Sequence, residues 1–272
     1  MVTAIRTALV YGASGRIGSA VCEEFRRAGF HIEVALRGQQ DRPDSCDVVV
    51  NAAGAGMAAN VAIREEELRA ANVDVAVLAA EVAVASRARL VHIGTAAGAS
   101  DARTDAYVET KREASERLAE MKSVGLEVVE LRPHLVVGGH WVDHGLLERI
   151  ASDLTVHGTF HLHRPRLRRD IVHARDVAAA VLRAATTPVV APTAIEIGTG
   201  CSMLMSEVAE AVAHALGTPG RWTADDTTAA GAIVADPRPA VRHLNFEARF
   251  SPAAAVQAAM DAEFLEHVRT LT

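Results

Sequence analysis

A chain of 272 residues can bury one large core, or one large core together with a small lobe. Half of its residues are hydrophobic and 23% are charged, which is ordinary for a globular protein. The formal net charge of -6 argues against nucleic-acid binding driven by phosphate neutralisation, and charges interrupt every apolar stretch before it reaches transmembrane length.

The cysteine pattern and the start of the chain indicate the compartment. Cys22, Cys46 and Cys201 are widely spaced and odd in number, so neither a disulfide framework nor a zinc site is predicted. The first apolar run leads directly into a glycine-rich loop, which is not the layout of a signal peptide. We therefore expect a cytoplasmic protein without a bound metal and without a membrane or nucleic-acid partner.

Short β-type runs alternate with longer helical patterns along the chain. This alternation predicts an α/β fold with a Rossmann-like, doubly wound parallel sheet and helices on both faces. Strands are expected at residues 7–11, 31–36, 48–51, 90–94, 127–132 and 194–197. Helices are expected at residues 16–28, 64–86, 107–122, 175–185, 204–216 and 252–269.

One connection is too short for the standard version of this fold. Only residues 38–47 separate Arg37, at the end of the second strand, from Val48. A crossover helix alone takes about 10–12 residues. The third strand, which lies at the sheet edge in the usual order, is therefore expected to be missing or abbreviated.

A glycine-rich loop, Gly12-Ala-Ser-Gly-Arg-Ile-Gly18, follows the first strand and opens the first helix. Glycines at this spacing allow a tight turn and a close backbone approach, and the helix N-terminus attracts a pyrophosphate. This context predicts a dinucleotide-binding loop. The residues expected to contact the cofactor here are Gly12, Ser14, Gly15, Arg16 and Ile17.

Tyr107 and Lys111 stand four residues apart in the helix expected at 107–122. That spacing places a phenol and an ammonium group on one helical face, where the cation lowers the pKa of the proton donor. The alternative is an ordinary amphipathic helix residue beside a solvated lysine. Together with the glycine loop, the pair predicts an enzyme.

With these features placed, nearly the whole chain resembles the extended short-chain dehydrogenase/reductase family of nucleotide-sugar epimerases, dehydratases and ketoreductases. Val91-His-Ile-Gly-Thr95 is similar to the family strand that ends in a catalytic Ser or Thr. Leu131-Arg-Pro133 with Gly138 is similar to its nicotinamide loop. Arg169-Asp-Ile-Val-His-Ala-Arg-Asp176 and Ile195-Glu-Ile-Gly-Thr-Gly200 match later family segments.

The resemblance implies a role for each matching residue. Tyr107 would protonate a carbonyl oxygen, Thr95 would hydrogen-bond that oxygen, and Lys111 would hold the nicotinamide ribose. Further cofactor contacts are implied for Ala52, Ala53, Gly54 and Pro133, and substrate contacts for Thr95, Tyr107, His134, His140, Trp141 and Arg169. Thr95 could instead only cap the strand end. Asn72 matches a family helix position near the active site, and a purely structural polar residue is almost as good an interpretation.

The end of the second strand indicates the cofactor. NAD-dependent members of the family usually carry an acid there, whereas this chain reads Leu36-Arg37. A guanidinium suits the 2′-phosphate of NADP(H) through paired hydrogen bonds, and Arg16 could add a second contact. We therefore expect NADP(H), with a plain surface role for Arg37 as the alternative.

The residues after Thr95 narrow the reaction. Ala96 and Ala97 replace the acid pair of the family's 4,6-dehydratases, and Ala96 also replaces the cysteine of its epimerase-reductases. Excluding the dehydratase and epimerase-reductase reactions leaves an NADPH-dependent ketoreductase that acts on a small-molecule carbonyl. The expected substrate is a nucleotide-linked 4-keto-6-deoxysugar. The alternatives are reduction of a non-sugar ketone, nucleotide-sugar epimerisation, and NADP sensing without catalysis.

The expected domains interleave along the chain. Residues 1–138 and 171–198 would form the dinucleotide-binding domain, and residues 139–170 and 199–272 would form a small substrate-binding lobe. A homodimer is one expected assembly.

Overall fold

The computed structural model of the protein describes residues 6–36, 45–56, 63–98, 105–140, 145–188, 194–224 and 231–271. Its centre is a six-stranded parallel sheet in the order β10-β5-β4-β3-β1-β2. The strands are β1 (Thr7–Tyr11), β2 (His31–Ala35), β3 (Val48–Asn51), β4 (Arg89–Ile93), β5 (Val128–Pro133) and β10 (Ala194–Ile197). The expected α/β fold with a parallel Rossmann-like sheet is confirmed.

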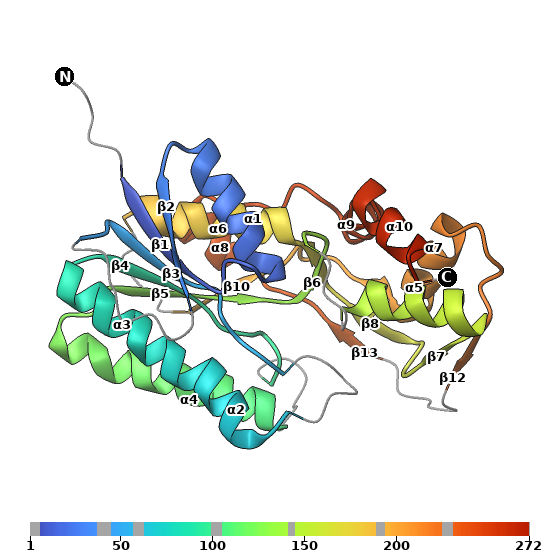
Figure 1. The fold of residues 1–272 in the computed structure, drawn as a ribbon, viewed down its shortest axis with the longest axis horizontal. Helices are drawn as coiled ribbons and strands as arrows, with labels where there is room; N and C mark the ends of the chain where they lie inside the picture. Colours follow the sequence, from blue (N-terminus) through green and yellow to red (C-terminus); the bar gives the residue numbers. More distant parts are fainter. Residues whose placement is uncertain are drawn as a thin grey trace.

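Helices cover both faces of this sheet (Figure 1). One face carries α1 (Arg16–Arg27), α6 (Ala174–Thr186) and α8 (Arg238–Leu244). The other carries α3 (Val75–Ser86) and α4 (Ala106–Met121), with α2 (Glu65–Arg69), the π-helix η1 (Ala70–Asp74) and the 3-10 turn η2 (Lys122–Val124) beside them. Two separate apolar clusters result, one between the sheet and each helical layer.

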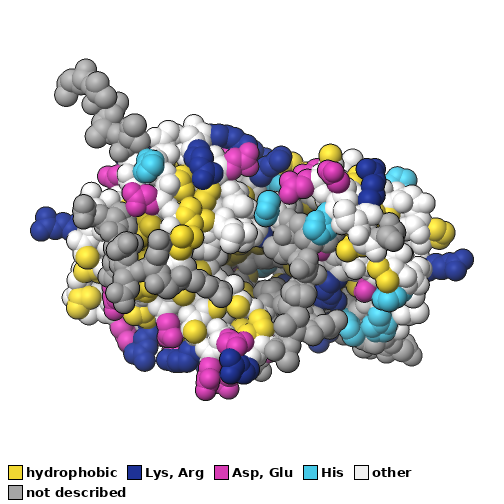
Figure 2. Space-filling view, in the orientation of Figure 1, with side chains coloured by type: hydrophobic (Ala, Val, Ile, Leu, Met, Phe, Trp, Pro, Cys, Tyr) yellow, Lys and Arg dark blue, Asp and Glu magenta, His cyan; other side chains and the backbone are white. Residues whose placement is uncertain are grey.

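A third apolar cluster lies in the C-terminal part of the molecule. It is built on the helices α5 (Leu146–His157), α7 (Met205–Ala215), α9 (Pro252–Ala259) and α10 (Ala262–Arg269). Short strands accompany them: β6 (Leu135–Val137), β7 (Phe160–Leu162), β8 (Leu167–Arg169), β9 (Ile171–His173), β11 (Met203–Leu204), β12 (Trp222–Ala224) and β13 (Gly231–Ile233). Figure 2 shows the molecule hollowed between this lobe and the sheet.

One segment belongs to a different part than expected. Residues 238–246 were expected in the small lobe, but Ala240, Leu244 and Phe246 are buried in the apolar cluster beneath α6. The reason is that α8 packs between α6 and the edge strand β10. The C-terminal third of the chain therefore contributes to both cores.

Strand β2 forms the open edge of the described sheet. The next strand along the chain, β3, pairs with the opposite side of β1, which agrees with the expected loss of the outer strand. Leu36, directly after β2, keeps 58% of its surface exposed, and Val34 keeps 43%. Residues 37–44, where a third strand would begin, lie outside the described residues.

None of the helices in the described ranges combines the length and apolar character needed to span a bilayer.

Candidate active site

Two glycines of the loop between β1 and α1, Gly12 and Gly18, lie too close to neighbouring backbone to be replaced by a larger residue. Gly12 has φ +73°, and a Cβ on it would lie 2.6 Å from the backbone nitrogen of Ala53. A Cβ on Gly18 would lie 2.0 Å from the carbonyl oxygen of Gly12. Among the described residues, no side chain caps the N-terminus of α1, whose N-cap is Gly15. The loop therefore has the shape and the open helix N-terminus that a dinucleotide pyrophosphate requires.

Lys111 lies at the carboxyl ends of two neighbouring strands. Its ammonium group donates to the carbonyl of Ile93 at 3.0 Å and to that of Ala53 at 3.5 Å. A Cβ on Gly54 would lie 3.0 Å from Nζ, so the backbone after β3 runs directly past the lysine. Burial lowers the pKa of Lys111 to about 8, an effect that the negative charge of Glu130 opposes. Residues 52–54 thus lie close to both the glycine loop and the lysine.

The side chain of Asn72 links this backbone segment to helix α4, which carries Tyr107 and Lys111. It lies buried in the π-helix, and its side-chain oxygen accepts from the backbone of Ala55 at 2.9 Å. Its amide nitrogen donates to the carbonyl of Ala55 and to Thr110 Oγ1, at 3.1 and 2.9 Å. π-Helical turns are frequent at functional sites. Asn72 therefore connects η1, residues 54–56 and α4 through its side-chain hydrogen bonds.

Tyr107 is half-buried in the first turn of α4, which Asp105 caps by accepting from Val108 N at 3.2 Å. A Cβ on Gly56, whose φ is +104°, would lie 3.2 Å from the Tyr107 ring. Thr95 follows β4, and its Oγ1 accepts from the backbone of Ala97 at 3.2 Å. The next residue, Ala96, donates to the carbonyl of Pro133 at 3.2 Å. The structure thus places Thr95, Lys111 and Pro133 at one edge of the sheet, with Tyr107 one turn before the lysine.

The side chain of Arg16 contacts the C-terminal lobe. Its guanidinium donates to the carbonyl of Gly138 at 3.0 Å and to the carboxylate of Glu148 on α5. Glu148 is buried and Arg16 is partly buried, and a buried carboxylate needs such a counter-charge. The guanidinium is therefore engaged with the C-terminal lobe in this structure, an arrangement that gives no support to the expected contact with a 2′-phosphate.

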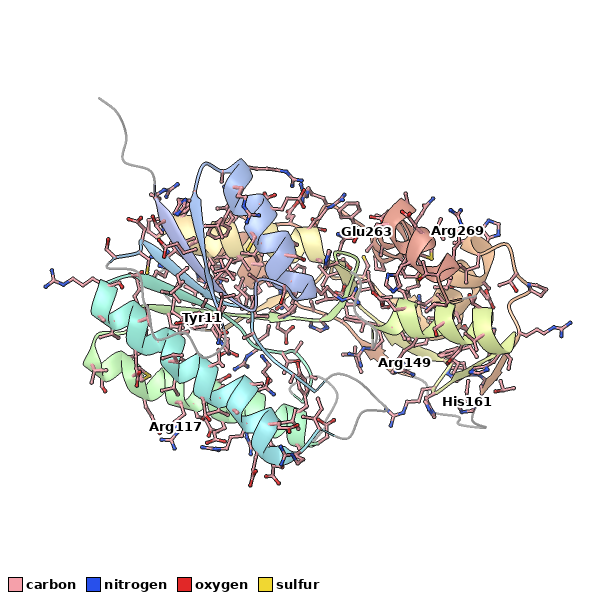
Figure 3. All side chains as sticks on the ribbon, in the orientation of Figure 1. Tyr11, Arg117, Arg149, His161, Glu263 and Arg269 are labelled. Atoms are coloured by element: carbon pink, nitrogen blue, oxygen red, sulfur yellow. The ribbon has the colours of Figure 1, made fainter. Side chains whose placement is uncertain are left out.

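The predicted substrate residues are not all gathered in one place. His134 is buried, with Nε2 3.3 Å from Glu196 Oε2 and with no partner for Nδ1 among the described residues. His140 lies on the surface, 3.4 Å from the carboxylate of Glu263 on α10, which Figure 3 labels. This position gives no support to a substrate contact by His140. Arg169 ends β8, and its role stays a prediction, while Arg37 and Trp141 lie outside the described residues.

A row of buried polar residues crosses the sheet beneath α4, and sequence reasoning missed most of it. Asn51, His92 and Glu130 are register neighbours on β3, β4 and β5. Asn51 Nδ2 lies 3.2 Å from His92 Nδ1. Burial, followed by the charges of Lys111 and Arg132, lowers the pKa of His92 well below 6.5, so the imidazole is neutral. The sequence signal that could have revealed this row is a charged or polar residue inside an otherwise apolar strand.

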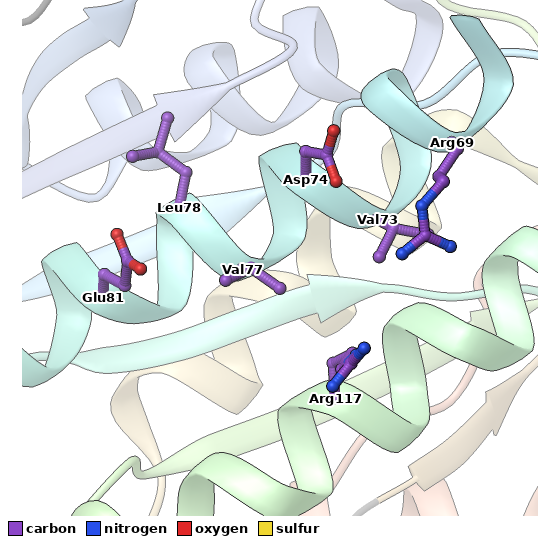
Figure 4. A pocket seen from close by; sticks show the side chains of 7 residues that line it. All are labelled: Arg69, Val73, Asp74, Val77, Leu78, Glu81 and Arg117. Atoms are coloured by element: carbon purple, nitrogen blue, oxygen red, sulfur yellow. The ribbon is translucent and has the colours of Figure 1, made fainter. Parts of the chain in front are cut away.

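A groove lies elsewhere, on the outer face of the helices. Figure 4 shows that it is lined by residues of α2, η1 and α3, with Arg117 from α4 on the opposite side. Those lining residues are Arg69, Val73, Asp74, Val77, Leu78 and Glu81. They include none of the predicted site residues, so this groove is separate from the candidate active site.

Comparison with solved structures gives the fold independently. MoeE5 in complex with UDP-glucuronic acid and NAD superposes with a TM-score of 0.81 at 21% identity, covering 98% of this chain and 100% of that one. RMD from Pseudomonas aeruginosa complexed with NADPH gives 0.80 at 13% identity, with coverages of 96% and 99%. A UDP-glucose 4-epimerase from Thermotoga maritima, with UDP-glucose, gives 0.80 at 15% identity, with coverages of 96% and 99%.

Comparison with curated protein sequences finds no significant match. The family model of the NAD dependent epimerase/dehydratase family matches residues 8–198, which include the glycine loop, Thr95, Tyr107 and Lys111. This match confirms the resemblance inferred from the motifs. The chain therefore belongs to the NAD-dependent epimerase/dehydratase family of NAD(P)-dependent enzymes, within the extended short-chain dehydrogenases/reductases.

Proposed function

We propose that the protein is an NADPH-dependent ketoreductase whose substrate is the carbonyl of a nucleotide-linked 4-keto-6-deoxysugar. The observation that carries this proposal is the position of Lys111, whose ammonium group contacts the carbonyls of Ile93 and Ala53 at 3.0 and 3.5 Å. These carbonyls belong to the strand ends beside Thr95 and the glycine loop. A proton donor, its cation and a dinucleotide loop thus share one edge of the sheet.

The chain's own residues divide the chemistry between them. When bound, the nicotinamide supplies the hydride, and Gly12, Gly15 and residues 52–54 are the elements that would hold the dinucleotide. Tyr107 gives its proton to the carbonyl oxygen as negative charge develops there. Thr95 donates a hydrogen bond to the same oxygen, and the charge of Lys111 favours the ionised form of the tyrosine. Asn72 keeps the backbone of residues 54–56 fixed against this helix.

Two features favour reduction over the other reactions of the family. Ala96, which is only 2% exposed, follows Thr95. The family's dehydratases carry an acid at this position for elimination, and its epimerase-reductases carry a cysteine for epimerisation. Leu36 stands where an acid would bind the ribose of NAD, and Arg37 follows it. A guanidinium at that point suits a 2′-phosphate. RMD, one of the similar structures, is described as complexed with NADPH, which supports a reductase using this fold.

The proposal is tested by following NADPH oxidation with a panel of carbonyl compounds. The panel contains nucleotide-linked 4-keto-6-deoxyhexoses, the free keto sugars, and cyclic and aromatic ketones. We expect turnover with the nucleotide-linked compounds and little with the free sugars. Turnover of ketones alone would favour the non-sugar reductase, and interconversion of nucleotide sugars with NAD would favour an epimerase and contradict the proposal.

Binding without turnover is the remaining alternative. A sensor would bind NADP(H) and show no activity with any member of the panel. The Tyr107–Lys111 pair argues against that alternative, because binding alone does not require a proton donor. The homodimer expected from the sequence also remains a proposal, and light scattering of the purified chain measures it directly.

A further inference from the structure

The positive charge of Lys111 is energetically unfavourable at the buried position that this residue occupies. Only 5% of the residue is exposed, and the two groups that its ammonium contacts, the carbonyls of Ile93 and Ala53, are neutral. Burial disfavours the charged form of an amine unless an opposite charge lies nearby. The role proposed for this lysine depends on its being protonated, so the surrounding chain must supply that opposite charge.

Glu130 is a buried carboxylate on β5, 7% exposed, on the face of the sheet that α4 covers. Its Oε1 lies 2.9 Å from Ser115 Oγ and 2.7 Å from Arg132 Nε. Ser115 follows Lys111 by one helical turn, and its hydroxyl is also 3.0 Å from the carbonyl of Lys111. The carboxylate is thus connected directly to the turn of helix that carries the lysine.

Gly94 provides the space that this carboxylate occupies. A Cβ at position 94 would lie 2.3 Å from Glu130 Oε1. The residue immediately after it is Thr95, and the residue before it, Ile93, accepts from Lys111. The carboxylate therefore lies against the backbone between two groups of the proposed site, although no step of the reaction uses it.

We propose that Glu130 is a positioning residue for Lys111: its carboxylate, held by Ser115 and Arg132 over Gly94, keeps the ammonium charged in the buried base of the site. This inference rests on the proposed function, which gives the charge of Lys111 its role in the reaction. The effect of Glu130 on that charge is nevertheless a property of the protein without cofactor or substrate. The carboxylate acts through the lysine and touches no reacting atom.

The other groups that face Lys111 do not replace this charge. His92 on β4 is fully buried and neutral, because burial lowers its pKa. Asn51 on β3 and Asn72 on η1 are uncharged amides, and Tyr107 on the same helix as the lysine carries a phenol rather than a carboxylate. Arg132 on β5 adds a second positive charge, partly neutralised by Glu130. Within the described ranges, Glu130 is the carboxylate whose charge raises the pKa of Lys111 against burial.

The chain permits a direct measurement, because Lys111 and Lys122 are its only lysines. Protein carrying lysine labelled with carbon-13 at Cε gives two side-chain signals, which Lys122→Arg assigns. Titrating the cofactor-free protein then yields the pKa of Lys111, with Lys122 as internal reference. We expect Glu130→Gln, which removes the charge and keeps the shape, to lower the pKa of Lys111 by about one unit.

Matched variants make the result specific. Glu127→Gln removes an exposed carboxylate just before the same strand and should leave the Lys111 titration unchanged. Arg132→Gln removes the neighbouring cation and should raise the pKa of Lys111, and this variant keeps the test available if Glu130→Gln does not fold. Opposite shifts in the two variants support the proposal.

A shift below about 0.3 units in folded Glu130→Gln would overturn the proposal, as would an unchanged or lowered pKa of Lys111 in Arg132→Gln when only that variant folds. In the enzyme assay, the alkaline limb of the pH–rate profile should move to lower pH in Glu130→Gln. A uniform loss of rate at every pH would indicate a merely structural residue and contradict the proposal. Because the titration needs no substrate, it can fail or succeed independently of the proposed ketoreductase activity.

Discussion

The guanidinium of Arg16 and the carboxylate of Glu148 form a largely buried ion pair between the glycine loop and helix α5 of the C-terminal lobe. The two side chains keep only 12% and 4% of their surface exposed. Arg16 also donates to the carbonyl of Gly138, which ends the segment leading from β5 into the lobe. The loop that would hold the cofactor is therefore tied to the part of the molecule that would hold the substrate.

Removing one member of this pair should be more damaging than removing both. Glu148→Leu leaves a buried guanidinium without its counter-charge and should lower the free energy of unfolding by about 3 kcal/mol. Urea denaturation of Glu148→Leu, Arg16→Met and the double variant measures the coupling. Strictly additive losses would show that the two charges do not interact.

Much of the sheet could be predicted because its signals are local. All six strands of the parallel sheet were expected within one residue of their observed bounds, since each is an apolar run bounded by turn residues. The helix expected at 252–269 is in fact broken, because Asp261 accepts from Phe264 N and starts α10. The helix expected at 64–86 contains the π-helix that buries Asn72, a change of register that helical periodicity does not reveal.

The C-terminal lobe and the electrostatics of the site were not predictable in the same way. Strands β12 and β7 have three residues each and pair across about sixty positions of sequence, so no local pattern announces them. Helix α5 was missed, and with it Glu148, whose partner lies 132 positions away. Glu130 is visible as a charged residue in a buried strand, but only the structure shows Ser115, Arg132 and Gly94 around it.

Gly54→Ala tests how closely the backbone after β3 confines the lysine. The new Cβ would lie 3.0 Å from Lys111 Nζ and 3.1 Å from Asn72 Oδ1, so both side chains must shift. Small displacements of reacting groups are costly, and we expect roughly tenfold slower turnover. Gly231→Ala is the control, since its Cβ would meet the nearest atom at 3.9 Å. Equal rates for the two variants would show that the lysine has room to move.

Lys111→Met should damage turnover and cofactor binding while changing the pH dependence of stability. The folded-state pKa of Lys111 is lowered from 10.5 to about 8, so between these values the unfolded chain binds more protons and the stability of the unmodified protein rises with pH. The methionine variant lacks this rise. Relative to the unmodified protein, it should therefore lose about 3 kcal/mol of stability between pH 8 and 10.5. Thermal unfolding across this range checks the prediction, and a constant difference would mean that Lys111 titrates normally.

Cofactor preference should depend on Arg37. We expect NADPH to bind roughly tenfold more tightly than NADH, because a guanidinium can pair with the 2′-phosphate through charge-assisted hydrogen bonds. Arg37→Asp should reverse or abolish the preference, whereas Arg16→Met should leave it in place, since the Arg16 guanidinium is paired with Glu148. Fluorescence titration with both cofactors measures the ratio. Equal affinities for NADPH and NADH in the unmodified protein would contradict the proposal that NADP(H) is the cofactor.

The most direct test of the account is the turnover of Tyr107→Phe on the carbonyl substrate that the panel identifies, measured together with its affinity for NADPH. General acid catalysis contributes about 10²–10⁴ in rate. Loss of the hydroxyl should lower turnover by that order and leave NADPH affinity nearly intact, because the aromatic ring and its packing survive. Near-normal turnover by Tyr107→Phe would contradict the proton-donor role and with it the proposed reductase mechanism.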